Sequence, residues 1–263
     1  MRFLRLILFI ALFSFVLSPT TAYADTARSW YTTRCGNKQP PLPSDIDNLS
    51  EYNAYYLNSS LGDGSDRRVI YITFDAGYEN GNVEKILDIL KAEDVPAAFF
   101  VLDNIILKNT ELVKRMGDEG HLVCNHTKNH KDMTKCSYDE MKKNLTDLEK
   151  IYEEKTGRVM AKYFRFPEGR YDEKSMRCAS ELGYATVFWS FAYEDWDNAR
   201  QPSEKKSIKK ILDNTHNGEV ILLHPTSETN VKILPCLIKE WRARGYTFGT
   251  LDELVADVQP QPR

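Results

Sequence analysis

Short apolar runs alternate with longer segments of mixed polarity through most of the chain after residue 67. The runs are rich in β-branched and aromatic residues, and their length predicts buried strands over residues 69–74, 97–102, 121–124, 163–166, 185–189 and 220–223. The segments between them carry helix signals. Continuous apolar strands that alternate with helices predict a parallel sheet covered by helices, and six or seven such units favour closure into a barrel.

Capping signals mark several of these helices, which are predicted over residues 138–154, 173–182, 204–215 and 231–244. Ser137 and Glu140 form a capping-box pattern at the start of the first helix. Asp172 and Ser203 are the expected caps of the next two. Pro235 either interrupts or starts the last one, because proline has no N–H to donate.

The first 67 residues lack this periodicity and divide into two segments. Residues 1–24 carry Arg2 and Arg5, then an apolar stretch over 6–17 and small residues around Ala24, which predicts a cleaved secretory signal. The stretch is shorter than the roughly 20 residues that span a bilayer. An uncleaved anchor is the alternative. Residues 25–67 are rich in Pro, Asn and Ser and predict an irregular arm on a single domain formed by residues 68–258.

Composition bears on whether the protein binds nucleic acid and on whether its cysteines form disulfides. The 263 residues carry a formal net charge of −3, and cleavage after Ala24 removes two arginines, which shifts the charge to −5. Mild acidity gives no nucleic-acid footprint. The five cysteines are odd in number and lack C-x-x-C spacing, so we expect buried thiols for most of them. One disulfide between two of the five cysteines is the alternative, since disulfides form in exported proteins and the chain is expected to be exported.

Polar residues with catalytic potential follow the ends of predicted strands. Asp75 comes at the end of the first strand, where a buried carboxylate needs a partner or a function. The alternative is a cap for a helix near Asn80. His126 and His130 stand four residues apart, so on one helical turn both imidazoles would face the same side and could share a cation. Two surface histidines are the alternative for this pair.

A second group of candidates follows the later strands. Arg165 could pair with Asp75 and keep it ionised, and the backbone N–H of Glu168 is a candidate oxyanion donor. Asp195 could hold His224 protonated, so that His224 can donate a proton. For Arg165 and His224, structural roles are the alternatives.

Other histidines and neighbouring residues fit ordinary structural positions. His121 and His216 fit helix–strand junctions, and Cys124 fits a strand. Phe188 and Trp189 read as core aromatics, whereas Trp196 lies beyond the strand.

Five motifs in order resemble the polysaccharide deacetylase family, carbohydrate esterase family 4, also called the NodB homology domain. They are Thr73–Phe74–Asp75–Ala76–Gly77, the His126 and His130 pair, Arg165–Phe166–Pro167–Glu168–Gly169, Asp195–Trp196 and Leu222–Leu223–His224. The resemblance covers residues 69–255 and implies an α/β fold, a deformed (β/α)7-8 barrel with the N-terminal irregular arm added. It also implies removal of N- or O-acetyl groups from glycans.

The resemblance assigns a role to each matched residue. Asp75 matches the general base, and His126 and His130 match the metal ligands. Arg165 orients the base. Asp195 supports His224, the general acid.

One position departs from the pattern of most family members. They have a second aspartate after the base that ligates the metal, whereas this chain has Ala76. We therefore expect two imidazoles and water to hold a divalent cation, with zinc favoured, and to hold it weakly.

Three further segments resemble a narrower group, the delta-lactam-forming muramic acid deacetylases of spore-forming bacteria, which also lack the second aspartate. The segments are residues 29–31, 49–56 and 77–81. This resemblance implies peptidoglycan whose N-acetylmuramic acid has lost its peptide as the substrate.

The sequence thus predicts a metal-assisted peptidoglycan de-N-acetylase that acts on N-acetylmuramic acid on the route to muramic delta-lactam. Tyr78, Arg170 and Trp196 are the expected substrate contacts. The expected partners are peptidoglycan glycan strands, with no nucleic acid and no membrane span after signal cleavage. We expect an exported monomer at the cell wall or spore cortex, with a role in sporulation. An N-acetylglucosamine deacetylase of peptidoglycan or chitin-like glycans and a non-catalytic glycan-binding protein are the alternatives.

Overall fold

A single parallel sheet forms the centre of the computed structural model, which describes residues 26–62 and 64–258. In order across the sheet its strands are β2 (Ala54–Tyr55), β8 (Ala185–Val187), β6 (Ala161–Phe164), β5 (Leu122–Asn125), β4 (Ala98–Val101), β3 (Val69–Ala76), β10 (Glu219–Leu223) and β9 (Phe191–Ala192), with β11 (Thr247–Phe248) paired to β3. All six predicted strands are present, with ends shifted by up to two residues. The predicted signal segment, residues 1–24, lies outside the described residues.

The sheet curls until its two ends approach each other. Strand β8 pairs with β6, and β9, which follows β8 after three residues, pairs with β10 on the other side. The short β2 also pairs with β8, and Leu57 just after it forms a bridge to Glu219 of β10. The predicted deformed (β/α) barrel is therefore confirmed, as a curled sheet whose closure depends on short, irregular strands.

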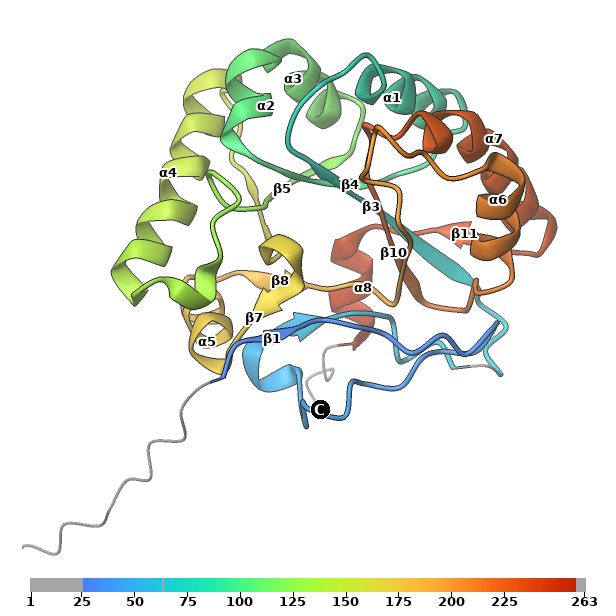
Figure 1. Cartoon of the computed structure of the whole chain (residues 1–263), viewed down its shortest axis with the longest axis horizontal. Helices are drawn as coiled ribbons and strands as arrows, with labels where there is room; N and C mark the ends of the chain where they lie inside the picture. The colour runs from blue at the N-terminus through green and yellow to red at the C-terminus, as the bar shows by residue number, and fades with distance from the viewer. Residues whose placement is uncertain (1–25, 63, 259–263) are drawn as a thin grey trace, which may run out of the picture.

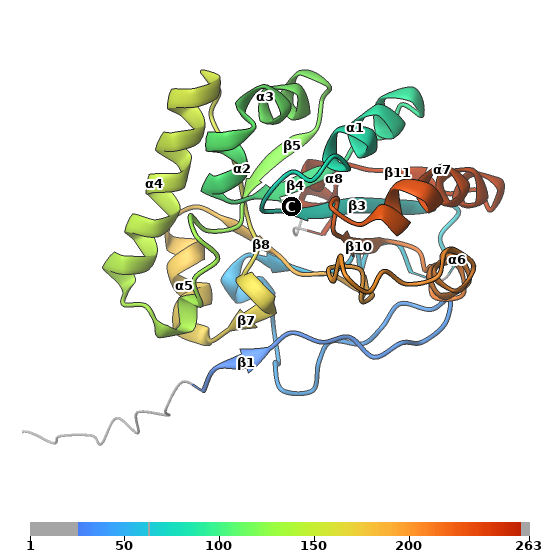
Figure 2. The same ribbon diagram turned by 45° about the horizontal axis from the view of Figure 1, so that its top comes forward.

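Helices surround this sheet on its outer side, and the last one, at residues 251–258, packs against the interior of the barrel, as Figures 1 and 2 show. They are α1 (Val83–Ala92), α2 (Asp103–Lys108), α3 (Thr110–Asp118), α4 (Tyr138–Thr156), α5 (Glu173–Glu181), α6 (Glu204–Leu212), α7 (Glu228–Ala243) and α8 (Leu251–Val258). The capping box of Ser137 and Glu140 is present at α4, and the Asp172 side chain accepts from the N–H of Ser175 at α5. Ser203 precedes α6 as predicted, but its side chain makes no cap hydrogen bond.

Helix α7 differs from the prediction because it starts three residues earlier. Ser227 caps it by accepting from the N–H of Asn230, so Pro235 lies inside the helix rather than at its start. A proline removes one helical hydrogen bond. Burial of Leu234 and Trp241 on the same helix offsets that loss.

Alternation along β3 separates the barrel interior from the outer core. Ile70, Ile72, Phe74 and Ala76 belong to the cluster shared with the surrounding helices, whereas Val69 and Tyr71 belong to the interior cluster that includes Leu251 and Leu254 of α8. Side chains of a strand point alternately to opposite faces. Asp75 therefore continues the inward set, which is the reason that its carboxylate emerges inside the mouth of the barrel.

The arm lies against the barrel and is less irregular than predicted. It contributes β1 (Arg28–Ser29), which pairs antiparallel with β7 (Arg170–Tyr171), as well as β2 within the main sheet. The indole of Trp30 stacks on Phe188 with ring centroids 4.2 Å apart. Backbone pairing and aromatic packing of this kind fix a segment that has no hydrophobic period of its own.

Two global expectations concern membranes and thiols. Across residues 26–62 and 64–258, no helix combines the length and apolarity needed to cross a bilayer. All five cysteines are free; Cys124, Cys136 and Cys178 are buried as expected for most of them, while Cys35 and Cys236 are exposed.

Candidate active site

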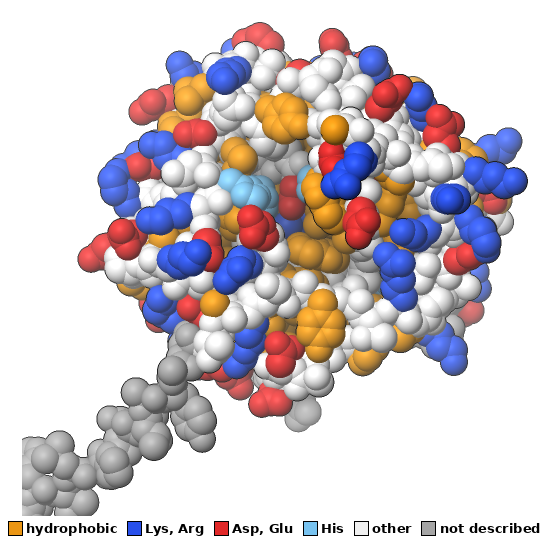
Figure 3. Space-filling view, in the orientation of Figure 1, with side chains coloured by type: hydrophobic (Ala, Val, Ile, Leu, Met, Phe, Trp, Pro, Cys, Tyr) orange, Lys and Arg blue, Asp and Glu red, His pale blue; other side chains and the backbone are white. Residues whose placement is uncertain are grey.

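A cavity of about 650 Å³ opens at the carboxyl ends of the strands and gathers most of the candidate residues. Figure 3 shows this hollow near the centre of one face, with histidine and acidic side chains inside it and hydrophobic side chains around it. Its polar and aromatic lining comprises Asp75, Tyr78, His126, His130, Glu168, Trp189, Tyr193, Trp196, His224 and Thr226. The expected convergence of strand-end residues is therefore present.

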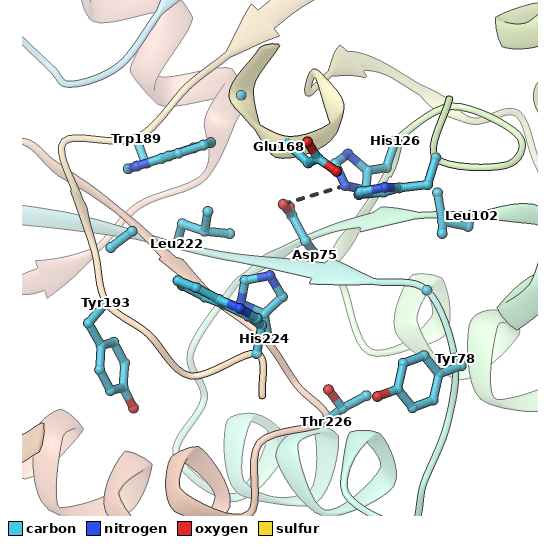
Figure 4. Close-up of a pocket in the computed structure, with 15 residues that line it drawn as sticks. Asp75, Tyr78, Leu102, His126, Glu168, Trp189, Tyr193, Leu222, His224 and Thr226 are labelled. Atoms are coloured by element: carbon cyan, nitrogen blue, oxygen red, sulfur yellow. Dashed lines mark ion pairs between the residues drawn. The ribbon is translucent and has the colours of Figure 1, made fainter. Parts of the chain in front are cut away.

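The Asp75 carboxylate lies between a guanidinium and an imidazole. Its Oδ1 accepts a hydrogen bond from Arg165 Nη1 at 2.9 Å, and its Oδ2 lies 3.6 Å from His126 Nε2. Figure 4 shows Asp75 near the centre of the cavity, with His126 on one side and His224 on the other. This position suits a base that takes a proton from a molecule held within the cavity.

Arg165 is fully buried and uses its guanidinium to fix the floor of the site. Besides Asp75, it donates from Nη2 to Thr73 Oγ1 at 2.9 Å and from Nε to the Val187 carbonyl at 2.9 Å. Its Cζ lies 4.1 Å from the centroid of the Phe100 ring. The rigid fork of arginine supplies several donors in one plane, so Arg165 holds the Asp75 rotamer.

These contacts set the charge state of Asp75. Burial by itself would raise the pKa of Asp75, whereas His126, Arg165 and His224 favour the ionised form and bring the pKa below its ordinary value. At neutral pH the permanent charge of Arg165 and protonated His224 contribute to this effect, whereas His126 is uncharged there. Asp75 is therefore available as a base at neutral pH.

His126 is buried and oriented by the backbone. Its Nδ1 lies 2.9 Å from the Arg165 carbonyl, so this nitrogen carries the proton and Nε2 keeps a free lone pair. Burial lowers the pKa of His126 to about 4. A neutral imidazole with Nε2 facing the cavity is the form that binds a metal ion.

His130 reaches the same place by a route that the sequence did not predict. The two histidines are not on a helical turn, because the chain after β5 forms a loop in which Thr127 (φ 72°) and His130 (φ 57°) are left-handed. Asn125 supports this loop by accepting from the N–H of Thr127 at 2.9 Å. The imidazole rings still lie close together, with centroids 5.0 Å apart and planes at 71°.

The two imidazoles fit a divalent cation, with few further donors near them. Zinc accepts imidazole nitrogen, and the His126 tautomer leaves Nε2 free for it. Ala76 packs in the outer core and has no side-chain oxygen to offer. Among the residues that the structure describes, no group of three or more His, Cys, Asp or Glu side chains is arranged around one point.

His224 and Asp195 form a second pair across the cavity. Asp195 is fully buried; its Oδ1 lies 2.7 Å from His224 Nδ1, and its Oδ2 accepts from the His224 backbone N–H at 2.8 Å. Burial alone would lower the pKa of His224, but the Asp195 carboxylate outweighs it, so the pKa lies above its ordinary value. The predicted pairing of the two is thus present, and Nε2 of His224 is the ring nitrogen left to face a ligand.

Asn230 supports the Asp195 and His224 pair, a role that was not predicted from the sequence. Its Nδ2 donates to Asp195 Oδ2 at 2.6 Å and to the His224 carbonyl at 3.0 Å, and its Oδ1 accepts from the Tyr193 hydroxyl. Asn230 is buried in the first turn of α7. Nothing near it in the sequence marks this contact, since it spans 35 positions.

The turn after β6 places Glu168 at the rim of the cavity. Glu168 is left-handed (φ 56°) and Gly169 follows with φ 62°, so the chain reverses tightly here. A Cβ on Gly169 would approach the Trp189 ring to 2.8 Å, which explains why glycine is needed. The N–H of Glu168 as an oxyanion donor stays a prediction.

The expected substrate contacts divide between the cavity and its surroundings. Trp196 and Tyr78 line the cavity and are exposed, and the Tyr78 hydroxyl accepts from Asn198 Nδ2. Arg170 is not among the lining residues; its Nε lies 3.2 Å from Asp132 Oδ2. Trp189, expected in the core, instead forms part of the cavity wall, because the chain between β8 and β9 breaks the strand alternation.

The remaining candidates take structural positions. His216 lies 2.8 Å from Ser190 Oγ and 2.9 Å from the Asn214 carbonyl, and His121 packs edge-on to Phe99. Neither histidine lines the cavity. Cys124 is a buried strand residue whose thiol pKa is raised by burial.

Comparison with known proteins gives relatives over most of the chain. A family model described as polysaccharide deacetylase matches residues 62–187. The chain is 35% identical over 229 residues to peptidoglycan-N-acetylmuramic acid deacetylase PdaA of Bacillus subtilis, which covers 86% of this chain and 85% of that protein. It is 30% identical over 196 residues to a peptidoglycan-N-acetylglucosamine deacetylase of Bacillus cereus, covering 73% of this chain and 90% of that one.

Comparison with solved structures gives the same family as comparison of sequences. The solved structure of Bacillus subtilis PdaA, described as a family 4 carbohydrate esterase, matches with a TM-score of 0.83 and 32% identity, over 89% of this chain and 98% of the other. Sequence identity and fold thus extend together over the barrel and the cavity. The chain belongs to the polysaccharide deacetylase family, carbohydrate esterase family 4, and is an enzyme of that family.

Proposed function

We propose that this protein hydrolyses the N-acetyl amide of peptidoglycan sugars, with N-acetylmuramic acid on the route to muramic delta-lactam as its substrate. The observation that supports it most is the placement of Asp75 between Arg165 and His126, with the His224 and Asp195 pair across the same cavity. A base and an acid with opposed pKa shifts suit the two proton transfers of amide hydrolysis. The relative named for N-acetylmuramic acid supports the substrate.

His126 and His130 are the residues that would hold the divalent cation of the proposal, with zinc favoured. When bound, such a cation would polarise the amide carbonyl and make a water molecule more acidic. The two residues contribute orientation: the Arg165 carbonyl fixes the His126 tautomer, and the left-handed loop brings His130 beside it.

The protein's own groups then account for the proton transfers. Asp75, ionised and held by Arg165, takes the proton of the attacking water. The Glu168 N–H at the rim donates to the oxygen that becomes negative. His224 is protonated because of Asp195 and gives its Nε2 proton to the departing nitrogen, so that acetate and a free amine are released.

The catalytic role of Asp75 has a direct test. Asp75→Asn keeps the size of the side chain and removes the base, so acetate release from peptidoglycan glycan should fall by about two to four orders of magnitude. Asp213→Asn, which changes an exposed carboxylate directly after α6 that pairs with Lys209, is the matched control and should leave turnover unchanged. Unchanged acetate release by Asp75→Asn, with an unfolding temperature close to that of the parent, would remove Asp75 from the mechanism.

The same parts would serve an N-acetylglucosamine deacetylase, and the relative from Bacillus cereus favours this as the second candidate. Acetate release from peptide-free muramic glycans and from chitin oligomers separates the two. Faster release from chitin oligomers would reject the muramic assignment. Glycan binding without acetate release from either substrate would favour a non-catalytic protein instead.

The proposal also has consequences for where the protein acts and what it produces. We expect an exported monomer that meets glycan strands outside the cytoplasm. A freed muramic amine next to a lactyl carboxyl can close a lactam with loss of water. Mass spectrometry of the product glycan distinguishes the open amine from the lactam and so decides whether this protein drives the second step.

A further inference from the structure

The lining of the catalytic cavity contains carboxylates but no lysine or arginine among the residues that the structure describes. Asp75 and Glu168 both face it, and Arg165 is fully buried with Nε, Nη1 and Nη2 already donating. Carboxylates in a cleft repel an anionic ligand. A muramic residue that has lost its peptide carries a free lactyl carboxylate, which a cation at the border of the cavity would attract.

The N-terminal arm carries an arginine to that border. Arg34 Nη2 donates to the carbonyl of Ala192 at 3.4 Å, and Ala192 itself lines the cavity. The Arg34 guanidinium also lies 5.7 Å from the centroid of the Phe191 ring. A backbone carbonyl and an aromatic ring of β9 thus hold the side chain beside a residue that lines the cavity.

The arm that carries Arg34 is fixed by contacts to the wall of the cavity. The Trp30 N–H donates to the Gly169 carbonyl at 2.8 Å, and Trp30 Nε1 donates to the Trp189 carbonyl at 2.8 Å. Gly169 and Trp189 both line the cavity. Three residues separate Trp30 from Arg34, so the cavity wall that fixes Trp30 also restricts the position of the arginine.

Arg34 also has unused capacity to bind an anion. Within the described ranges, no aspartate or glutamate forms an ion pair with it, and its side chain is exposed. Arg170, the arginine expected from the sequence, differs because Asp132 lies 3.2 Å from its Nε. An arginine without a carboxylate partner retains the donor pair that matches a carboxylate.

We propose that Arg34 is a specificity-determining residue that recognises the carboxylate of an anionic glycan strand at the border of the catalytic cavity. This inference rests on the proposed function and deepens it, since it names the charged group by which muramic and neutral glycans are told apart. The N-terminal arm is then part of the substrate site and not only a structural cover.

The test compares two forms of one substrate. Peptide-free muramic glycan with free lactyl carboxylates is used beside the same glycan with these groups converted to neutral methylamides. Arg34→Ala should raise KM for the carboxylate form roughly tenfold or more and change it little for the amide form, as expected for loss of a charged hydrogen bond. Arg34→Lys, which keeps the charge, should recover part of the affinity, and the salt dependence of KM should weaken in Arg34→Ala.

The control is Arg200→Ala, which removes another exposed arginine, one that pairs with Asp197 in the loop after β9. It should leave the ratio of the two KM values unchanged. Equal losses on both substrates in Arg34→Ala, or no loss on either, would overturn the inference while leaving the proposed function intact. Wild-type turnover of the amide form and of chitin oligomers, without turnover of the carboxylate form, would overturn both.

Discussion

Replacement of Asp195 by asparagine should disable the proton donor while preserving the shape of the cavity. Asp195 Oδ2 accepts from the His224 N–H at 2.8 Å and from Asn230 Nδ2 at 2.6 Å, so an asparagine must present its oxygen to these two donors. Its NH2 group then faces His224 Nδ1, where Oδ1 accepted at 2.7 Å. Two donors cannot share this contact, so Nδ1 must become an acceptor and His224 must become neutral, with its proton on Nε2.

The size of the effect follows from this tautomer change. The pKa of His224 lies above its ordinary value because of Asp195, although burial acts in the opposite direction. A charged hydrogen bond is worth about 1.5 to 3 kcal/mol, which corresponds to a fall of roughly one to two pKa units. Since the acid must be protonated, activity is present below its pKa and lost above it. The alkaline limb of kcat/KM should therefore move to lower pH in Asp195→Asn.

The assay is acetate release from peptide-free muramic glycan across the pH range. At neutral pH we expect a loss of about two to four orders of magnitude, the usual contribution of a positioned acid. Asp197→Asn, two residues later and partly exposed, is the matched control and should keep both the rate and the alkaline limb. A parent-like pH profile for Asp195→Asn would refute the assignment of His224 as the acid.

Three further changes address the rest of the site. Arg165→Met should leave Asp75 buried and unpaired, which costs about 3 to 5 kcal/mol in the free energy of unfolding and moves the acid limb of kcat/KM to higher pH; an unchanged acid limb would contradict the pairing. His126→Ala should lower zinc content in elemental analysis and zinc affinity in calorimetry, and parent-like values of both would reject His126 as a ligand. Asn230→Ala should move the alkaline limb to higher pH by about one unit, because an Asp195 carboxylate with one donor fewer holds the His224 proton more strongly; a parent-like limb would make Asn230 purely structural.

The strands and the strand-end residues were predictable because both depend on local pattern. Apolar runs of strand length with helix signals between them give the barrel, and the inward alternation along β3 fixes the face on which Asp75 appears. Arg165 and His224 follow the ends of their strands in the same way. Parallel strands place their carboxyl ends at one edge, so such residues meet without any further information.

The supporting contacts were not predictable, because they join distant segments or depend on unusual backbone. The loop with Thr127 and His130 in left-handed conformation replaced the expected helical turn. Asn230 and Arg34 act through partners 35 and 158 positions away, and no local pattern marks such contacts. Trp189 lies on the cavity wall because the chain leaves the strand geometry between β8 and β9.

The central claim is that the cavity around Asp75 removes the acetyl group from muramic residues. Mass spectrometry of defined peptide-free muramic glycans, incubated with the parent protein and with Asp75→Asn, tests it most directly. The account predicts loss of one acetyl group from muramic residues with the parent and none with the variant. Intact muramic acetyl groups after incubation with active parent protein, or equal deacetylation by both proteins, would contradict it.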